Sequence, residues 1–201
     1  MKTSKFIFFF VIIFLFVVNT FTIVSAGEPT QQLKQTIEEV TSILKNQELK
    51  SPEKIKERRG AIRKAVGARF DFQEMSQRSL AVHWKQRTPE ERKEFVELYS
   101  DLLEKTYINK IEGYTDEKVE YTGESIEGDY AVVKTVIVTR KLEIPMEYRF
   151  LKKGDKWLVY DVVIEGVSLI NNYRNQFNQI IRSGSYQDLV KRLQEKKGES
   201  L

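Results

Sequence analysis

The first part of the chain alternates apolar and polar residues at the spacing of amphipathic helices. The first stripe follows Pro29 and consists of Leu33, Ile37, Val40 and Leu44. A second helical pattern follows Ser51, and the next residue is a proline. A third follows Asp71, which has Glu74 three residues after it, as in a helix N-cap. These patterns predict several helices before residue 88.

A longer helix is predicted to begin at Thr88. Glu91 completes a capping box with Thr88, and Pro89 occupies the first helical position, where proline is well tolerated. One apolar stripe runs from Phe95 to Tyr107, and the pattern stops near Gly113.

The middle of the chain changes to the two-residue period of strands. Four segments rich in β-branched and aromatic residues cover 119–126, 130–140, 143–152 and 157–164. Gly128-Asp129 and Gly154-Asp155 stand where tight hairpin turns are needed. Four consecutive strands with such short connections predict an antiparallel meander.

The last part of the chain returns to helical spacing. Apolar residues from Ile170 to Ile181 line one face, Gly184 ends this helix, and Ser185 with Asp188 caps a final one. Helices, then a sheet, then helices predict an α+β fold, in which N- and C-terminal helices cover a four-stranded antiparallel meander sheet.

The N-terminus has the pattern of a secretory signal peptide. Lys2 and Lys5 precede an apolar run at 6–18, and a small-residue cleavage site ends at Ala26. We therefore predict a signal peptide at 1–26, cleavage near Ala26, and one exported domain at 27–201. An uncleaved N-terminal anchor is the alternative interpretation.

Composition then excludes several classes of site. The chain of 201 residues has a formal net charge of +4, no cysteine and one histidine. Zinc ribbons, iron–sulfur sites and cysteine nucleophiles need thiols, so no metal site is predicted. The charge is too small to indicate nucleic-acid binding.

Few residues are candidates for catalysis. A hydrolase or isomerase would have to use either His83, the single histidine, or Asp161. Glu165 lies four residues after Asp161 and could form a carboxylate pair with it. His83 has no nucleophile motif beside it, and the simpler interpretation of Asp161 is that it orders a corner between strand and helix. A basic run at 54–64 indicates a solvated helix face, with docking to anionic headgroups or an acidic partner as the alternative.

Two longer motifs resemble one protein family. The first runs from Phe70-Asp71-Phe72 through His83-Trp84 and Thr88-Pro89-Glu90-Glu91-Arg92 to Thr106-Tyr107. The second runs from Trp157 through Tyr160-Asp161-Val162 and Ile164-Glu165-Gly166-Val167-Ser168-Leu169 to Gln176-Phe177. Their order is similar to that of the MlaC-like toluene-tolerance family, periplasmic phospholipid-binding auxiliary components of ABC transporters that maintain outer-membrane lipid asymmetry.

The resemblance implies a monomeric, non-enzymatic periplasmic carrier that has no cofactor and holds phospholipid as cargo. It also implies an apolar cavity between sheet and helices. Its implied partners are an inner-membrane ABC transporter complex with its membrane-anchored substrate-binding component, and an outer-membrane lipoprotein complex. The lipid-binding residues that we predict are large apolar side chains of the helices and strands: Phe95, Tyr99, Leu103, Val136, Val138, Met146, Tyr148, Val163, Ile170 and Phe177.

A filled core is the main alternative to a hollow one. The same apolar residues could pack only against one another, because composition does not distinguish a filled core from a hollow one. In that case the protein would be a periplasmic adaptor of a membrane complex. The headgroup, the number of acyl chains and the direction of transport are not encoded in any motif of this sequence.

Overall fold

The computed structural model describes residues 28–114 and 117–198. The predicted signal peptide at 1–26 lies outside these residues. Nine helical segments and five strands follow the predicted order within the described part of the chain. The predicted α+β class is confirmed.

The N-terminal helices are α1 (Glu28–Lys45), the short 3₁₀ turns η1 (Gln47–Leu49) and η2 (Pro52–Lys54), α2 (Ile55–Gly67), α3 (Phe72–Leu80), η3 (Ala81–Gln86) and α4 (Pro89–Glu112). Two helices, α5 (Leu169–Ser183) and α6 (Tyr186–Gly198), follow the sheet. Side-chain caps begin several of them. At α4, Thr88 Oγ1 accepts the Glu91 N–H at 3.2 Å, and Glu91 Oε2 accepts the Thr88 N–H at 2.9 Å, which confirms the predicted capping box.

The sheet is an antiparallel meander with strand order β1-β2-β3-β4-β5. Its strands are β1 (Lys118–Glu127), β2 (Tyr130–Val138), β3 (Glu143–Lys153), β4 (Lys156–Ile164) and β5 (Val167–Ser168). We predicted four strands. The fifth has only two residues and follows a tight turn at Glu165 and Gly166, both with positive φ, so it is too short to give a sequence pattern of its own.

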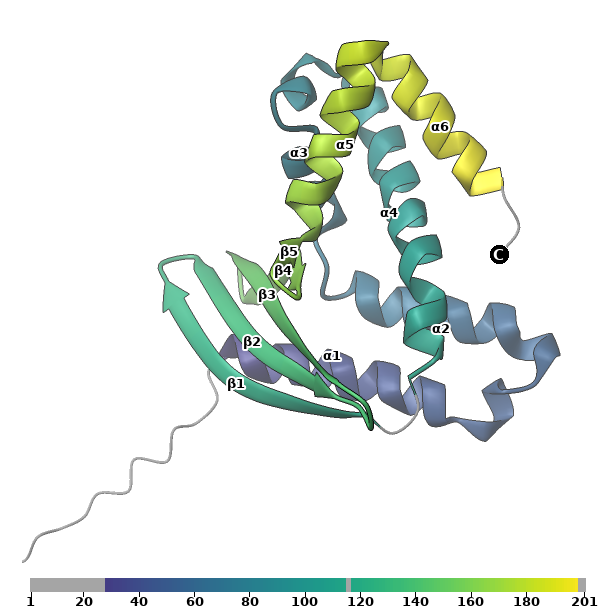
Figure 1. Cartoon of the computed structure of the whole chain (residues 1–201), viewed down its shortest axis with the longest axis vertical. Coiled ribbons are helices and arrows are strands. Elements are labelled where there is room, and N and C mark those ends of the chain that lie inside the picture. The colour runs from purple at the N-terminus through teal and green to yellow at the C-terminus, as the bar shows by residue number, and fades with distance from the viewer. Residues whose placement is uncertain (1–27, 115–116, 199–201) are drawn as a thin grey trace, which may run out of the picture.

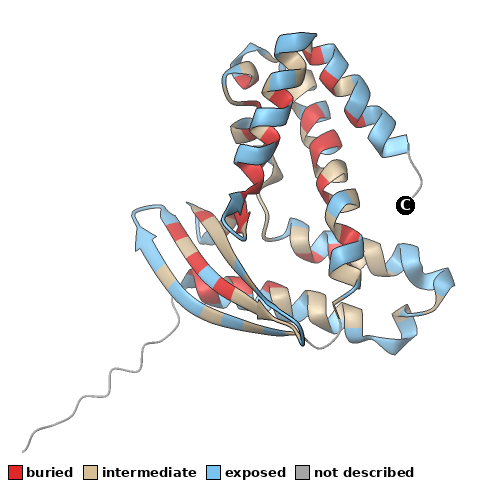
Figure 2. Cartoon of the chain, in the orientation of Figure 1, coloured by how far each residue is buried: buried red, intermediate tan, exposed pale blue. Residues whose placement is uncertain are grey.

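One face of the sheet is covered and the other is more open. On β2, Ala131, Val133 and Thr135 are buried, whereas Lys134 between them is exposed. Figure 2 shows this alternation along the strand. Helix α1 packs on the covered face through Leu33, which joins Phe150 and other strand residues in one apolar cluster.

The edge of β4 is partly closed by the link between α2 and α3. The backbone N–H of Asp71 donates to the Val159 carbonyl, and the Val159 N–H donates to the Arg69 carbonyl, each at 2.9 Å. The Arg69 guanidinium also donates to the Trp157 carbonyl. This link therefore ties the N-terminal helices to the sheet.

Helices α3, α4, α5 and α6 form a second region, above the sheet in Figure 1. Phe95 and Tyr99 of α4 are fully buried and contact Phe177 of α5, with ring centroids 5.6 and 5.4 Å apart. Tyr186 and Leu189 of α6 complete this aromatic cluster. In Figure 1, α4 continues out of the cluster toward α2.

Candidate functional site

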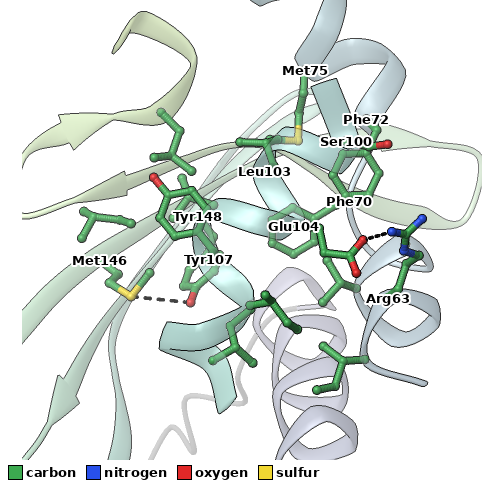
Figure 3. Close-up of a pocket in the computed structure, with 18 of the residues that line it drawn as sticks. Arg63, Phe70, Phe72, Met75, Ser100, Leu103, Glu104, Tyr107, Met146 and Tyr148 are labelled. Carbon is green, nitrogen blue, oxygen red and sulfur yellow. Dashed lines mark hydrogen bonds and ion pairs between the residues drawn. The ribbon is translucent and has the colours of Figure 1, made fainter. Parts of the chain in front are cut away.

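An apolar cavity of about 500 Å³ lies between the two regions. It has the size of a ligand site, since small-molecule pockets span about 300–1,000 Å³. Helices, the α2–α3 link and the covered face of the sheet supply its lining: Ile62, Arg63, Val66, Gly67, Phe70, Phe72, Met75, Ser100, Leu103, Glu104, Tyr107, Ile108, Ile111, Ile137, Met146, Tyr148, Val162, Ile164 and Leu169. Figure 3 shows side chains from these elements converging on one space.

The helical walls follow from helical periodicity. Ile62 and Val66 of α2 are four residues apart, as are Leu103, Tyr107 and Ile111 of α4. Residues at this spacing lie on one face of a helix. Each helix therefore presents a continuous apolar stripe to the cavity.

The sheet wall follows from strand register. Tyr148 of β3 pairs with Val162 of β4, and Met146 pairs with Ile164. Paired residues of an antiparallel ladder point to the same face. All four line the cavity, and Ile137 of β2 extends the wall.

The charged groups of the lining lie together, on α2 and α4. Arg63 of α2 forms an ion pair with Glu104 of α4, and Ser100 stands one turn before Glu104. Figure 3 shows Arg63 and Glu104 pointing toward each other at the border of the space. The Arg63 side chain is 60% exposed, so this border is open to solvent.

Two tyrosines bring hydroxyl groups to the lining, but they stay neutral. Burial is the main cause that raises the pKa of Tyr148 and of Tyr107 above the ordinary value near 10. The Tyr148 hydroxyl donates to the Met146 sulfur, at 3.8 Å, which is a weak acceptor. A hydrogen bond with Thr135 offsets the rise in the pKa of Tyr148 only in part. The inner wall therefore carries no charge at neutral pH.

Three of the predicted lipid-binding residues line this cavity: Leu103, Met146 and Tyr148. The other seven do not. Phe95, Tyr99, Ile170 and Phe177 belong to the packed aromatic cluster of the helical region. The Tyr99 hydroxyl is occupied there by a hydrogen bond from Ser79 Oγ at 3.1 Å.

The remaining three, Val136, Val138 and Val163, point to the opposite face of the sheet. Val136 and Val138 flank Ile137, a lining residue, and successive side chains of a strand alternate between faces. Val163 likewise follows the lining residue Val162. Lipid contact at these seven positions stays a prediction, and none of the seven residues lines the cavity.

The wall formed by α2 and α3 was missed in the prediction. Ile62, Val66, Phe72 and Met75 all line the cavity. Their helical spacing is visible in the sequence, but nothing in that spacing tells which of several apolar stripes borders a void. The missing information is how the helices diverge in space.

The candidate catalytic residues have structural contacts. His83 Nε2 lies 3.1 Å from Asn178 Oδ1. Asp161 is 2% exposed and accepts hydrogen bonds from Ser168 Oγ at 2.7 Å and from the Ile170 N–H at 3.1 Å. Asp161 thus anchors the first turn of α5, the structural role expected of it.

Over residues 28–114 and 117–198, no three His, Cys, Asp or Glu side chains gather as metal ligands would. Within the same residues, no helix combines the length and apolarity of a membrane span.

The arginines of the basic run turn toward α4 rather than only to solvent. Arg58 and Arg59 bind the two carboxylate oxygens of Glu112 at 2.7 and 2.8 Å. Burial opposes ionisation of Glu112, but the hydrogen bonds from Arg59 and Arg58 outweigh it and lower the pKa. These ion pairs join α2 to α4 beside the cavity.

Comparison with protein families decides the assignment, because the model of the MlaC protein family matches residues 34–195. The chain belongs to the MlaC family. The match covers both regions of the fold and every element that lines the cavity. The resemblance of the two sequence motifs is therefore confirmed.

One curated protein and one solved structure are similar to this chain. The intermembrane phospholipid transport system binding protein MlaC of Haemophilus influenzae is 25% identical over 122 residues, which span 58% of this chain and 57% of that protein. The phospholipid-binding protein of Ralstonia solanacearum, solved in complex with a phospholipid, has a TM-score of 0.75 and 24% identity, covering 85% of this chain and 97% of that one. The second similarity establishes the shared fold.

Proposed function

We propose that this protein is a phospholipid carrier that holds acyl chains in the cavity between sheet and helices. One observation carries the proposal. The cavity is apolar over its inner wall, and the charged groups of its lining, Arg63 and Glu104, lie together at a solvent-facing border. A molecule that suits this arrangement has a long apolar part and one polar end.

The energetics of lipid transfer explain why such a wall is needed. Each methylene moved from an apolar environment into water costs about 0.8 kcal/mol, so a free phospholipid does not leave a bilayer readily. A carrier has to replace the bilayer by apolar contacts of similar strength. Side chains such as Leu103, Met146 and Ile137 offer such contacts and make no directional bonds that would delay release.

The relatives support the choice of ligand. One is named as a binding protein of an intermembrane phospholipid transport system, and the other was solved with a phospholipid bound. In keeping with the family, we propose a periplasmic, monomeric carrier whose signal peptide is removed near Ala26. Its partners would be an inner-membrane ABC transporter complex with its membrane-anchored substrate-binding component, and an outer-membrane lipoprotein complex.

This proposal places lipid contact on the cavity lining. Leu103, Met146 and Tyr148 remain from the sequence prediction, and Ile137 and Val66 join them. An enzymatic role receives no support, since His83 and Asp161 are occupied by the contacts of the helical region and of the α5 corner.

Two neighbouring residues of β2 provide a matched test. Ile137→Asp puts a carboxylate into the apolar cavity, whereas Val136→Asp puts the same group on the opposite face of the same strand. Each variant and the wild type would be delipidated, incubated with phospholipid vesicles and separated from them. Bound lipid phosphorus per protein is then measured.

We expect the wild type and Val136→Asp to bind lipid and Ile137→Asp to lose at least about tenfold of the binding, because an unpaired charge in an apolar site is costly. Circular dichroism of all three proteins checks the fold. No lipid phosphorus on the wild type would contradict the carrier function and favour an adaptor. Equal loss in both variants would contradict the placement of the lipid.

A further inference from the structure

The border of the cavity carries charges of both signs. Arg63 forms ion pairs with Glu104 and, at 3.4 Å, with Asp101, and Lys197 of α6 binds Asp101 at 2.9 Å. Arg63 and Glu104 line the cavity, and Asp101 and Lys197 continue this ion-pair network outside the lining. The formal charges of the four groups cancel. This arrangement differs from the purely basic site that would best hold an anionic headgroup.

The arginine at the border is freer than its neighbours on α2. The side chain of Arg63 is 60% exposed, while those of Arg58 and Arg59 are 16% and 20% exposed and bind Glu112 outside the lining. Arg63 can therefore turn toward a ligand without breaking the buried contacts that join α2 to α4.

The acid at the border is less exposed and better fixed. The Glu104 side chain is 18% exposed and lines the cavity one turn beyond Ser100. When Arg63 turns away to a ligand phosphate, Glu104 loses its direct ion-pair partner, since Arg59, which acts on Glu104 at longer range, stays bound to Glu112. A partly buried carboxylate without a counter-ion is unfavourable, so a second positive group is needed in its place.

We propose, building on the proposed carrier function, that Arg63 and Glu104 form a headgroup subsite that selects zwitterionic phospholipids. Arg63 binds the phosphate, for which a guanidinium has the matching donor geometry. Glu104 accepts from the ammonium group of the same headgroup, and the Ser100 hydroxyl lies beside them. Arg63 gives up its ion pairs with Glu104 and Asp101, and two ion pairs with the headgroup replace them. Asp101 keeps Lys197 as its partner.

An anionic headgroup fits this subsite less well. Phosphatidylglycerol supplies the phosphate but no cation, so Glu104 faces a second negative group once Arg63 has turned. Like charges placed together oppose binding. The acyl chains are the same in both lipids, which leaves the cavity wall without influence on this choice.

The test is a competition between two lipids with identical acyl chains. Delipidated full-length mature protein is incubated with vesicles of equimolar phosphatidylethanolamine and phosphatidylglycerol, and the protein-bound lipids are counted by mass spectrometry. The variants are Glu104→Gln, Arg63→Gln and the exchange Arg63→Glu with Glu104→Arg. Lys64→Gln and Glu97→Gln make the same charge changes on α2 and α4 at exposed positions outside the lining.

We expect the wild type and both control variants to enrich phosphatidylethanolamine about fivefold, the upper range for a partly exposed ion pair. Glu104→Gln should bind both lipids about equally, and Arg63→Gln should bind less of each. The exchange of the two charges should restore the preference, because it keeps one group of each sign.

The outcomes separate this inference from the carrier function. The headgroup subsite is overturned if Glu104→Gln binds the two lipids in the wild-type ratio. It is also overturned if a control variant changes this ratio as much as Glu104→Gln does. Either result leaves the carrier function intact. A wild-type protein that takes up neither lipid overturns both.

Discussion

The helical region and the cavity region use similar apolar residues to opposite effect. In the helical region, Phe95, Tyr99 and Phe177 fill the space between α4 and α5, and the centroids of their rings lie 5.4 to 5.8 Å apart. One turn beyond Tyr99 on the same helix, Leu103 faces a cavity of about 500 Å³, and Tyr107 faces it one turn further on. One helix therefore has a filled end and a hollow end.

The difference arises from what lies opposite each part of α4. Helix α5 lies opposite the filled end, and large aromatic rings of the two helices meet there and fill the space between them. The hollow end lies opposite α2 and the sheet, where Arg58, Arg59 and Arg63 reach acids of α4. Long ion-paired side chains hold two elements together without filling the space between them. Apolar composition thus does not decide whether a region is fully packed. The side chains that connect the surrounding helices and strands decide it.

The largest expected difference between the regions is the cost of removing a side chain. Phe95→Ala should lower the free energy of unfolding by about 3–5 kcal/mol, because it leaves a void in a filled cluster. Met146→Ala, on the half-buried wall of the hollow, should cost about 1 kcal/mol, since few contacts are lost. Urea unfolding of the delipidated proteins measures both. Equal losses would show that the two regions are packed alike.

The corner that joins the sheet to the filled region is expected to come next. Asp161→Ala should lower the free energy of unfolding by about 2–4 kcal/mol, because the Ile170 N–H and the Ser168 hydroxyl lose a buried acceptor and Arg149 loses one of its two ion pairs. The same urea titration measures the change. Glu165→Ala, at the exposed turn nearby, is the control and should change little; a comparable loss there would contradict the anchoring role of Asp161.

Filling the hollow should have a smaller effect on stability and a clear one on binding. Val66→Trp adds an indole at the α2 wall, where space is available. We expect the unfolding free energy to change by less than about 1 kcal/mol, in contrast to overpacking of a solid core, which costs about 1–3 kcal/mol. Bound lipid phosphorus should fall by half or more. A strong loss of stability at unchanged binding would argue against a cavity at this wall.

A change that appears only at alkaline pH should be similar in the two regions. Burial raises the pKa of Tyr186, in the helical cluster, and of Tyr121, on the sheet, each to about 12. The folded pKa exceeds the unfolded value near 10, so each tyrosine stabilises the fold fully below pH 10, and this contribution is lost as the pH rises toward 12. Allowing for solvent screening, we expect about 1 kcal/mol from each.

Unfolding free energies measured from pH 9 to 12 test this. The unfolding free energies of the variants Tyr186→Phe and Tyr121→Phe should each decrease less steeply with rising pH than that of the wild type. A steeper decrease in either variant would contradict the sign of the shift.

The sequence predicted the fold well because local signals mark its elements. The capping box at Thr88 fixes the start of α4, and the glycines at 128 and 154 fix the hairpins through their positive φ. The two-residue strand β5 carried no such signal. It exists because the Glu165-Gly166 turn folds the chain back on β4.

The site was harder to predict because it depends on tertiary geometry. Val136 and Ile137 are both apolar, and only the strand register decides which of them faces the helices. Tyr99 and Leu103 lie on one stripe of α4, and only the place where α5 ends its contact decides which of them borders a void. No one-dimensional pattern contains either piece of information.

The central claim is that the hollow region holds a phospholipid in the working protein. Native mass spectrometry of the protein expressed from its full sequence and purified without detergent tests this most directly. The account predicts a complex whose mass exceeds that of the polypeptide by one or more phospholipids and which releases them on organic extraction. A bare polypeptide mass that persists after incubation with vesicles would contradict it.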